Sequence, residues 1–272
     1  MEMKIPAEVT EIIDRLESAG YEAYCVGGAV RDSVMGITPG DWDITTSAKP
    51  YETQELFKDF KTVDTGLKHG TLTVIINHKP FEVTTFRIDG EYGDNRHPES
   101  VKFTPDLKDD LARRDFTVNA LAYNKRTGIV DLYGGQDDIY NSIVKTVGNP
   151  DKRFNEDGLR IMRALRFSAV LGFEIEKETA VSIHKNKDLL KNISAERIST
   201  ELAKLICGKN AFNVLMEYPD VLSVFIPEIA PAVKFKQYGE KHAYDVWEHI
   251  CHTVDTIPND KTLRLTMLLH DL

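Results

Sequence analysis

The sequence has little cysteine and no long apolar run. Its three cysteines, Cys25, Cys207 and Cys251, lie far apart and lack the spacing of a zinc site or a disulfide framework. We expect buried thiols in a reducing compartment. No stretch approaches the roughly 18 apolar residues of a membrane span, and residues 1–6 lack the apolar region of a signal peptide. A soluble cytoplasmic protein without a membrane partner is therefore expected.

An excess of positive charge is also missing. The net charge is −9, and the first 150 residues hold 25 acidic and 17 basic side chains, against 18 and 17 in the remainder. Composition alone does not suggest a nucleic-acid partner. If RNA binds, local basic patches must hold it, and binding should be sensitive to salt. With 272 residues, 42% apolar, the chain can form two or three globular units.

Residues 24–44 carry the strongest chemical signal. A short apolar run meets Gly27 and Gly28, and a helix-like stretch with Arg31 follows. A glycine turn before a helix directs backbone N–H groups toward a bound phosphate. Such a turn alone is weak evidence, because most glycine pairs simply form turns.

After a second break at Pro39 and Gly40, the run from Asp41 to Ile44 alternates acidic and bulky apolar residues, which predicts a strand. Asp41 and Asp43 then share a face. Two adjacent carboxylates repel each other unless a cation lies between them, and Mg²⁺ prefers such oxygen ligands. The alternative is a solvated loop. Combined with the glycine turn, the pattern predicts metal-assisted phosphoryl or nucleotidyl transfer.

Local patterns predict the elements around this stretch. Apolar residues at helical spacing predict a helix over 6–19, and a second helix is expected over 50–60. Two β-rich runs, 70–77 and 80–87, predict a hairpin, and the polar residues 88–100 predict a loop. Glu82 stands between Phe81 and Val83. It is either a third carboxylate of the site or a solvent-facing strand position.

Two further charge clusters are candidates for nucleotide contacts. One cluster, Arg113, Arg114 and Asp115, precedes an apolar segment. It is interpreted either as a contact to a triphosphate or ribose or as a charge cluster at a helix end. Residues 153–172 predict one continuous helix with Glu156, Arg160 and Arg163 on one face. Ion pairs four residues apart are the plain explanation, yet the arginines outnumber the partners expected for them.

Asp157 and Arg160 also suit a chemical task. Cytosine and adenine both present an amino donor beside a ring-nitrogen acceptor, whereas uracil and guanine present the reverse order. One acceptor side chain and one donor side chain would accept C and A and reject U and G. Selection by protein side chains would allow addition of two different bases without a template.

The ordered motifs resemble one known family, the class II tRNA nucleotidyltransferases and bacterial poly(A) polymerases. The resemblance covers residues 21–172 and rests on four runs. These are the Gly27–Asp32 run with Asp41-Trp42-Asp43, the Arg-Arg-Asp run within 111–123, the turn at 131–135, and Glu156-Asp157-x-x-Arg160-x-x-Arg163. The family belongs to the polymerase-β-like nucleotidyltransferase superfamily.

The resemblance implies an α+β fold with a nucleotidyltransferase head and a small mixed sheet in residues 1–148. A helical neck for base recognition is expected over 149–210, and a helical body with a truncated HD-like region over 211–272. The implied reaction adds CCA to the 3′ end of tRNA from CTP and ATP with Mg²⁺. Alternatives are an A-adding enzyme or poly(A) polymerase with the same head, or an RNA-binding or HD-type phosphohydrolase module. No protein partner is inferred.

The residue patterns and the resemblance together assign residue roles. The residues expected to be catalytic are Asp41, Asp43 and Glu82, and the first two are expected to hold two Mg²⁺ ions. The residues expected to bind the nucleotide are Gly28, Arg31, Arg114, Asp157, Arg160, Arg163 and Arg166. Asp94, Arg96 and Pro98 resemble the flexible loop of members that add adenosine. Basic residues expected to face RNA in the neck are Lys185, Lys187, Lys191 and Arg197.

Three residues near the end resemble the opening of an HD metal-dependent phosphohydrolase domain. They are His249, His270 and Asp271. A working HD site needs a further aspartate downstream, and the sequence ends at Leu272 in a predicted apolar helix. We therefore expect a truncated region without hydrolase activity.

Overall fold

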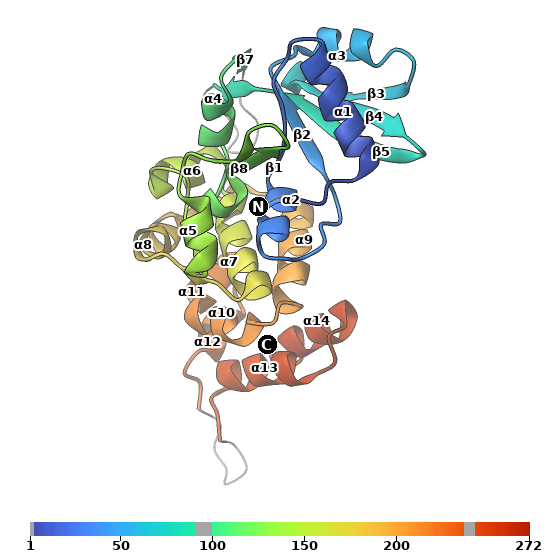
Figure 1. Cartoon of the computed structure of the whole chain (residues 1–272). Coiled ribbons are helices and arrows are strands. Elements are labelled where there is room, and N and C mark those ends of the chain that lie inside the picture. The colour runs from blue at the N-terminus through green and yellow to red at the C-terminus, as the bar shows by residue number, and fades with distance from the viewer. Residues whose placement is uncertain (1–2, 91–99, 237–242) are drawn as a thin grey trace. The chain divides into compact units, whose positions relative to one another are not determined.

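The computed structural model describes residues 3–90, 100–236 and 243–272 (Figure 1). The chain separates into two compact units. The first contains the described part of residues 1–148 apart from 142–144, and the second contains 142–144 and the described residues from 149 onward. The expected division of the second unit at residue 210 stays a prediction.

A seven-stranded mixed sheet forms the centre of the first unit, as predicted. Its spatial order is β3-β4-β5-β2-β1-β8-β9, and β2 and β5 run parallel while the other neighbours are antiparallel. The strands are β1 (Ala23–Val26), β2 (Asp43–Thr46), β3 (Lys61–Gly66), β4 (Thr71–Ile76), β5 (Lys79–Thr85), β8 (Leu121–Asn124) and β9 (Gly128–Asp131).

Apolar residues cover both faces of this sheet. Along β1, Ala23 and Cys25 join one apolar cluster, and Tyr24 and Val26 join another. Helices α1 (Ala7–Ser18) and α3 (Pro50–Leu56) pack on the first face, and α4 (Leu107–Ala112) contributes to the cluster on the second. The predicted helix over 6–19 is confirmed. The helix expected over 50–60 ends earlier, at Leu56.

The turns agree with the sequence signals. Asn77 and His78 adopt positive φ angles of 51° and 64°, which suits a two-residue hairpin turn between β4 and β5. Ile88 and Asp89, which the sequence predicted as part of a loop over 88–100, belong instead to β6 (Arg87–Asp89), which pairs with β7 (Val101–Phe103). Asp94, Arg96 and Pro98 lie outside the described residues. The other elements of the unit are α2 (Gly28–Val34), η1 (Leu67–His69), η2 (Thr117–Asn119) and α5 (Gly135–Tyr140).

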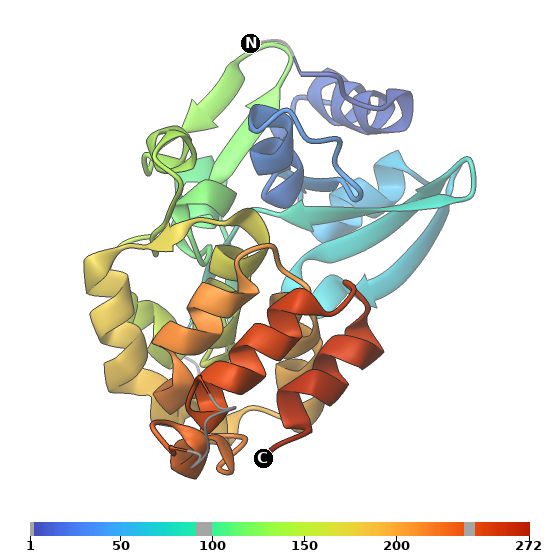
Figure 2. The same cartoon turned by 90° about the horizontal axis from the view of Figure 1, so that it is seen from below.

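The second unit is mainly helical, with one short parallel pair of strands, β10 (Ile143–Val144) and β11 (Glu174–Ile175). Figure 2 shows α13 and α14, in red, side by side. Its helices are α6 (Pro150–Glu156), α7 (Leu159–Leu171), α8 (Lys177–Asn186), η3 (Lys187–Asn192), α9 (Ala195–Ile206), α10 (Ala211–Glu217), α11 (Pro219–Leu222), α12 (Ile229–Ala232), α13 (Val246–Thr256) and α14 (Lys261–Leu269).

The prediction of one continuous helix over 153–172 is wrong, because the helix is interrupted between α6 and α7. Asp157 is extended (φ −143°, ψ 107°), and its Oδ1 accepts a hydrogen bond from the Leu159 N–H at 3.0 Å. Asp157 therefore caps the start of α7. A Cβ on Gly158 would lie 3.1 Å from Leu189, so glycine permits the close approach of η3. The break thus accompanies a contact between Gly158 and Leu189, which are 31 residues apart, and a local sequence pattern does not predict such a contact.

Two of the three cysteines are buried, as expected. Burial raises the pKa of Cys25 to about 12 and also raises the pKa of Cys251. Cys207 is only partly buried. Across the described segments, no helix has the length and apolar character needed to cross a membrane.

Candidate functional site

The two aspartates predicted to share a face flank the start of β2. The strand begins at Asp43 rather than at Asp41, so Asp41 lies just before it. Trp42 and Ile44 are buried, and both aspartates are exposed. The alternation read from the sequence therefore holds across the strand end and keeps both carboxylates away from the core.

Sheet pairing places Glu82 beside Asp43. Ile44 of β2 pairs with Val83 of the parallel strand β5, so the residues just before them, Asp43 and Glu82, lie next to each other on one face. Thr73 of β4 pairs with Glu82 from the other side. A cavity of about 750 Å³ opens here. Its lining includes Asp41, Asp43, Glu82, Thr73, Lys79 and Gly40.

Like charges dominate the electrostatics of this cavity, which we call the carboxylate cavity. Neighbouring protein atoms keep part of the water away from the Asp43 carboxylate, although the residue reaches the surface, and this desolvation raises its pKa. The guanidinium of Arg114 lowers the pKa, and the carboxylate of Asp41 raises it further. The pKa of Glu82 is raised by partial burial and by the charge of Asp43. Each ionised carboxylate makes its neighbour harder to ionise. A cation in the cavity would remove this penalty.

The donor set fits Mg²⁺, which takes oxygen ligands and usually keeps several waters. Asp41, Asp43 and Glu82 do not bring three ligand atoms within 4.8 Å of one another; the one described group that does so lies in the second unit. Two aspartates and open space would leave coordination positions for waters and for phosphate oxygens. The cavity therefore suits an ion that arrives together with a phosphate ligand better than a closed protein cage.

Arg114 lies near enough to Asp43 to lower its pKa, and it lies beside the glycine turn. Asp110 of α4 is fully buried, and it accepts hydrogen bonds from Arg113 Nη2 at 2.8 Å and from Arg114 Nη2 at 3.3 Å. Burial opposes the ionisation of Asp110, but the two guanidinium groups outweigh it and lower its pKa. Asp110 thus orients Arg114. Sequence reasoning missed this residue, although its spacing of four from Arg114 on a helix was a usable signal.

The glycine turn and short helix occur as predicted, at the start of α2. Gly27 has a φ of +71°, and a Cβ there would lie 3.0 Å from Arg114 Nη1, so glycine lets the guanidinium approach. Gly28 is the first residue of α2. Arg31 is buried, and it donates to Asn119 Oδ1 at 2.6 Å and to Asp32 Oδ1 at 2.7 Å. These contacts give Arg31 a role in holding the turn, and its phosphate contact stays a prediction.

The second unit holds Asp157 and Arg160 in a network of opposite charges. Asp157 Oδ2 accepts a hydrogen bond from Arg197 Nη2 at 2.8 Å. Arg160 Nη1 donates to Glu156 Oε2 at 2.6 Å and to the backbone carbonyl of Arg153 at 3.1 Å. Both candidate base-reading side chains are therefore fixed by neighbours. We call Asp157, Arg160, Glu156 and Arg197 the reading cluster.

The arginines of α7 have more partners than the sequence suggested. Arg166 Nε lies 2.6 Å from Oε2 of Glu201, a buried residue of α9, and its guanidinium stacks 3.8 Å above the ring of Phe167. The guanidinium of Arg163 lies 5.5 Å from the same ring centre. The expectation of few partners is wrong, because Glu201 comes from a distant part of the sequence and Glu156 pairs with Arg160 after all.

The basic residues expected to face RNA are also paired within the chain. Lys185 contacts Asp151, Lys187 contacts Asp220 and Lys191 contacts Asp188. Arg197, expected in the same group, holds Asp157. No local pattern connects residues 157 and 197, so sequence reasoning could not find this partner.

Two family profiles match the chain. Residues 23–145 match the poly A polymerase head domain, and residues 172–233 match the probable RNA and SrmB-binding site of polymerase A. The CCA-adding enzyme of Geobacillus kaustophilus (strain HTA426) is 43% identical over 262 residues, which cover 93% of this chain and 64% of the relative. That of Bacillus velezensis (strain DSM 23117) is 48% identical over 200 residues, covering 74% and 50%.

Solved structures give the same result. The Bacillus stearothermophilus CCA-adding enzyme in complex with CTP has a TM-score of 0.77 at 38% identity, covering 96% of this chain and 66% of that chain. A tRNA nucleotidyltransferase with a primer tRNA and an incoming ATP analog has a TM-score of 0.72 at 25% identity, covering 96% and 75%. The chain spans about half to two thirds of the curated relatives' length. It belongs to the family of class II tRNA nucleotidyltransferases and bacterial poly(A) polymerases, and it carries their polymerase-β-like nucleotidyltransferase head.

Proposed function

We propose that this chain adds C, C and A to the 3′ end of tRNA, using CTP, ATP and Mg²⁺. The carboxylate cavity is the observation that carries the proposal, because three acids converge there beside Arg114. The relatives are CCA-adding enzymes, and the similar solved structures include complexes with CTP and with a primer tRNA and an ATP analog. These substrates would place the activity in the cytoplasm.

The residues of the head have different proposed roles in phosphoryl transfer. Asp41 and Asp43 would hold Mg²⁺, which when bound acidifies a hydroxyl and neutralises phosphate charge. Glu82, beside Asp43, adds negative charge that favours cation binding and offers a further oxygen. Arg114, held by Asp110, presents a fixed positive charge to phosphate or ribose oxygens of the nucleotide. Gly27 keeps a side chain out of the space beside Arg114, and Gly28, the first residue of α2, is proposed to contact the phosphates.

The reading cluster would choose the base. Asp157 would accept the amino hydrogen that both cytosine and adenine present, and Arg160 would donate to the adjacent ring nitrogen. Discrimination of this kind depends on orientation, because a rotated donor and acceptor would suit uracil equally well. The hydrogen bonds from Arg197 to Asp157 and from Arg160 to Glu156 supply that orientation. Arg163 and Arg166 are proposed as further nucleotide contacts.

A primer-extension gel tests the proposal directly. Transfer RNAs that end before CCA, after C and after CC are each offered CTP, ATP or both, with Mg²⁺. Extension of the shortest tRNA through CCA, followed by a stop, is the expected result. A single A added only to the CC-ended tRNA would instead identify an A-adding enzyme, and long A tails a poly(A) polymerase. No product from a folded chain would contradict transferase activity for this chain.

A further inference from the structure

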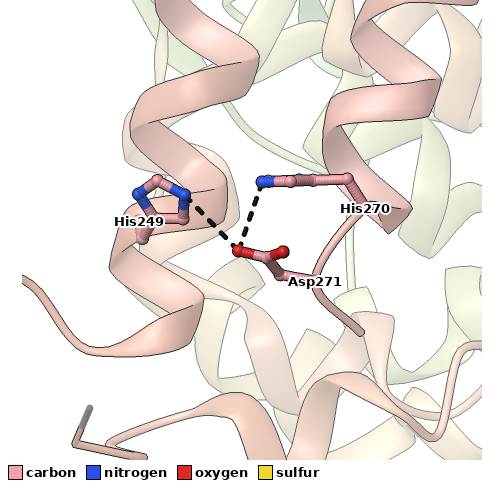
Figure 3. Close-up of side chains that lie close together, drawn as sticks. All are labelled: His249, His270 and Asp271. Atoms are coloured by element: carbon pink, nitrogen blue, oxygen red, sulfur yellow. Dashed lines mark ion pairs between the residues drawn. The ribbon is translucent and has the colours of Figure 1, made fainter. Parts of the chain in front are cut away.

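Asn119 is a buried polar residue to which neither the sequence nor the proposed reaction gives a role. It differs from the polar cluster of the second unit, where Figure 3 shows His249, His270 and Asp271 converging from α13 and the end of α14. Those three side chains are partly exposed and belong to the region where the sequence predicts a truncated HD-like domain. Asn119, the last residue of η2, is only 6% exposed. A buried amide needs partners for both its oxygen and its nitrogen.

The partners of Asn119 fix the orientation of its amide. Its Nδ2 donates to Asp115 Oδ1 at 3.1 Å, and its Oδ1 accepts a hydrogen bond from Arg31 Nη1 at 2.6 Å. An ionised carboxylate only accepts hydrogen bonds and a guanidinium only donates them, so turning the amide over would break both bonds. Asn119 therefore bridges Asp115 and Arg31 in one orientation.

Asp115 is a fixed point for this bridge. The N–H of Phe116 donates to Asp115 Oδ1 at 2.8 Å, and the N–H of Val147 donates to the backbone carbonyl of Asp115 at 3.1 Å. Asp115 itself is buried. The backbone thus holds the carboxylate, the carboxylate holds the amide of Asn119, and the amide holds the guanidinium of Arg31.

The other end of the bridge lies at the glycine turn. A Cβ on Gly28 would lie 3.6 Å from Arg31 Nη2, so the guanidinium lies beside the first residue of α2. Asp32 Oδ1 accepts hydrogen bonds from Arg31 Nε at 2.9 Å and from Nη2 at 2.7 Å. Because Asn119 is neutral, it orients Arg31 without adding to the negative charge of Asp32. A side chain that is already held in place loses less conformational entropy when a ligand binds.

We propose that Asn119 is a positioning residue, which acts through Arg31 to prepare the glycine turn for the triphosphate of the incoming nucleotide. This inference rests on the proposed function, which places the phosphates at that turn. Asn119 needs no contact with the base or the sugar for this role. Its effect on binding should therefore be large for CTP, which carries three phosphates, and small for CMP, which carries one.

Nucleotide binding in the absence of tRNA tests this proposal. Calorimetry with Mg²⁺ gives the Kd of CTP and of CMP for each variant. Asn119→Ala should raise the Kd of CTP about tenfold and that of CMP less than about twofold, because one hydrogen bond to a charged group is lost.

Asn124→Ala is the matched control. Asn124 is also buried in the first unit, on β8, but its amide donates to Glu17 and to the backbone carbonyl of Ala23. This variant should lower the Tm, as Asn119→Ala does, and leave both Kd values unchanged. A loss of CTP affinity that merely follows stability would appear in both variants.

A double-mutant cycle shows whether Asn119 acts through Arg31. Arg31→Ala should weaken CTP binding more than Asn119→Ala does. Adding Asn119→Ala to Arg31→Ala should change the Kd of CTP by less than about twofold further, because the side chain that Asn119 positions is already gone. Losses that multiply in the double variant would show that the two residues act independently, and they would overturn the proposal.

Asn119→Asp is a second test in a side chain of the same size. It keeps an oxygen acceptor for Arg31 but replaces the donor by a carboxylate oxygen that faces Asp115. Repulsion between the two carboxylates should raise the Kd of CTP at least about threefold. If Asn119→Ala does not fold, as judged by circular dichroism, this variant decides the question.

The proposal fails if Asn119→Ala or Asn119→Asp binds CTP as tightly as the original chain, or if CMP loses as much affinity as CTP. It also fails if the original chain does not bind CTP with Mg²⁺. A chain that shows the expected binding pattern but extends no tRNA would contradict the proposed transfer and leave the role of Asn119 intact. The two failures can therefore be told apart.

Discussion

The two units handle charge in opposite ways. In the carboxylate cavity of the first unit, Asp41, Asp43 and Glu82 bring like charges together, and the pKa values of Asp43 and Glu82 are raised. In the reading cluster of the second unit, Asp157 and Arg160 each contact an opposite charge within the chain. In the first arrangement Arg114 compensates the carboxylates only in part, and a bound cation would supply the rest, whereas the second is compensated before any ligand binds.

This difference matches two different tasks. A metal-dependent transfer site gains binding energy when a cation relieves repulsion between carboxylates, so its unbound form carries that repulsion. A site that recognises an uncharged base edge needs donors and acceptors whose positions do not change, because a misplaced hydrogen-bonding group recognises the wrong base. Internal ion pairs give that rigidity.

The largest effect is expected when the carboxylate cavity loses one acid. Asp41→Ala and Asp43→Asn should each reduce nucleotide incorporation at least about 10³-fold, because the Mg²⁺ ligand is lost. Neither should lower the Tm, since the removed charge was repelled by its neighbours. Primer extension and thermal melting measure both effects. Asp64→Asn, which removes an exposed acid elsewhere in the same unit, should retain activity; unchanged turnover in Asp41→Ala would refute the metal role.

The next effect concerns base choice. Asp157→Ala and Arg160→Ala should reduce the preference for C and A over U and G by about 10- to 100-fold, because each removes one side of the recognition pattern. Single-turnover incorporation of all four nucleotides provides the measurement. Asp188→Ala removes an exposed acid of the same unit as a control. Discrimination equal to that of the original chain in both test variants would contradict the base-reading role.

A smaller effect should follow when the reading cluster loses a support. Arg197→Ala should reduce discrimination about tenfold by releasing Asp157, and Arg197→Lys should restore part of it. The affinity for Mg²⁺ should not change. Lys191→Ala serves as a control from the same unit. If Arg197 were only structural, its loss would lower the Tm and leave the ratio of C to U incorporation unchanged.

The smallest effect is a dependence of stability on pH. Because the folded-state pKa values of Asp43 and Glu82 are raised, the folded chain binds their protons more strongly than the unfolded chain does. At a pH above these raised pKa values, ionisation of the two carboxyl groups therefore lowers the free energy of unfolding. This loss disappears as the pH falls toward about 4, near the ordinary pKa of a carboxyl group. Asp43→Asn should melt about 1–2 °C higher than the original chain at pH 7. That advantage should vanish at pH 4; a constant difference in Tm would contradict the account.

Local sequence patterns predicted the features that depend on residues close together in the sequence. The apolar spacing of α1, the hairpin at Asn77 and His78, and the alternation around Asp43 depend on neighbours along the chain, and all three occur. Glu82 could be predicted as a site residue because a charged side chain is unusual within an otherwise apolar strand. The placement of Asp41, Asp43 and Glu82 around one cavity followed from strand pairing.

The errors arose where distant residues decide the outcome. The break at Gly158 accompanies its close approach to Leu189, and the partners of Asp157 and Arg166 are Arg197 and Glu201. None of these contacts follows from a helical or strand period. The pair of Glu156 with Arg160 differs from these contacts, because its spacing of four residues is a local pattern that predicts an ion pair.

The bonding capacity of Asp157 has a consequence for what can replace it. A carboxylate offers about four lone-pair positions, and the described contacts use one for the Leu159 N–H and one for Arg197. The remaining positions are enough to accept a base amino group. An asparagine has the same shape but only one accepting oxygen, and its amide hydrogens would face either the helix start or a guanidinium. The contacts of Asp157 within the protein therefore require a negatively charged side chain. A base amino group alone could donate its hydrogen bond to a neutral acceptor as well.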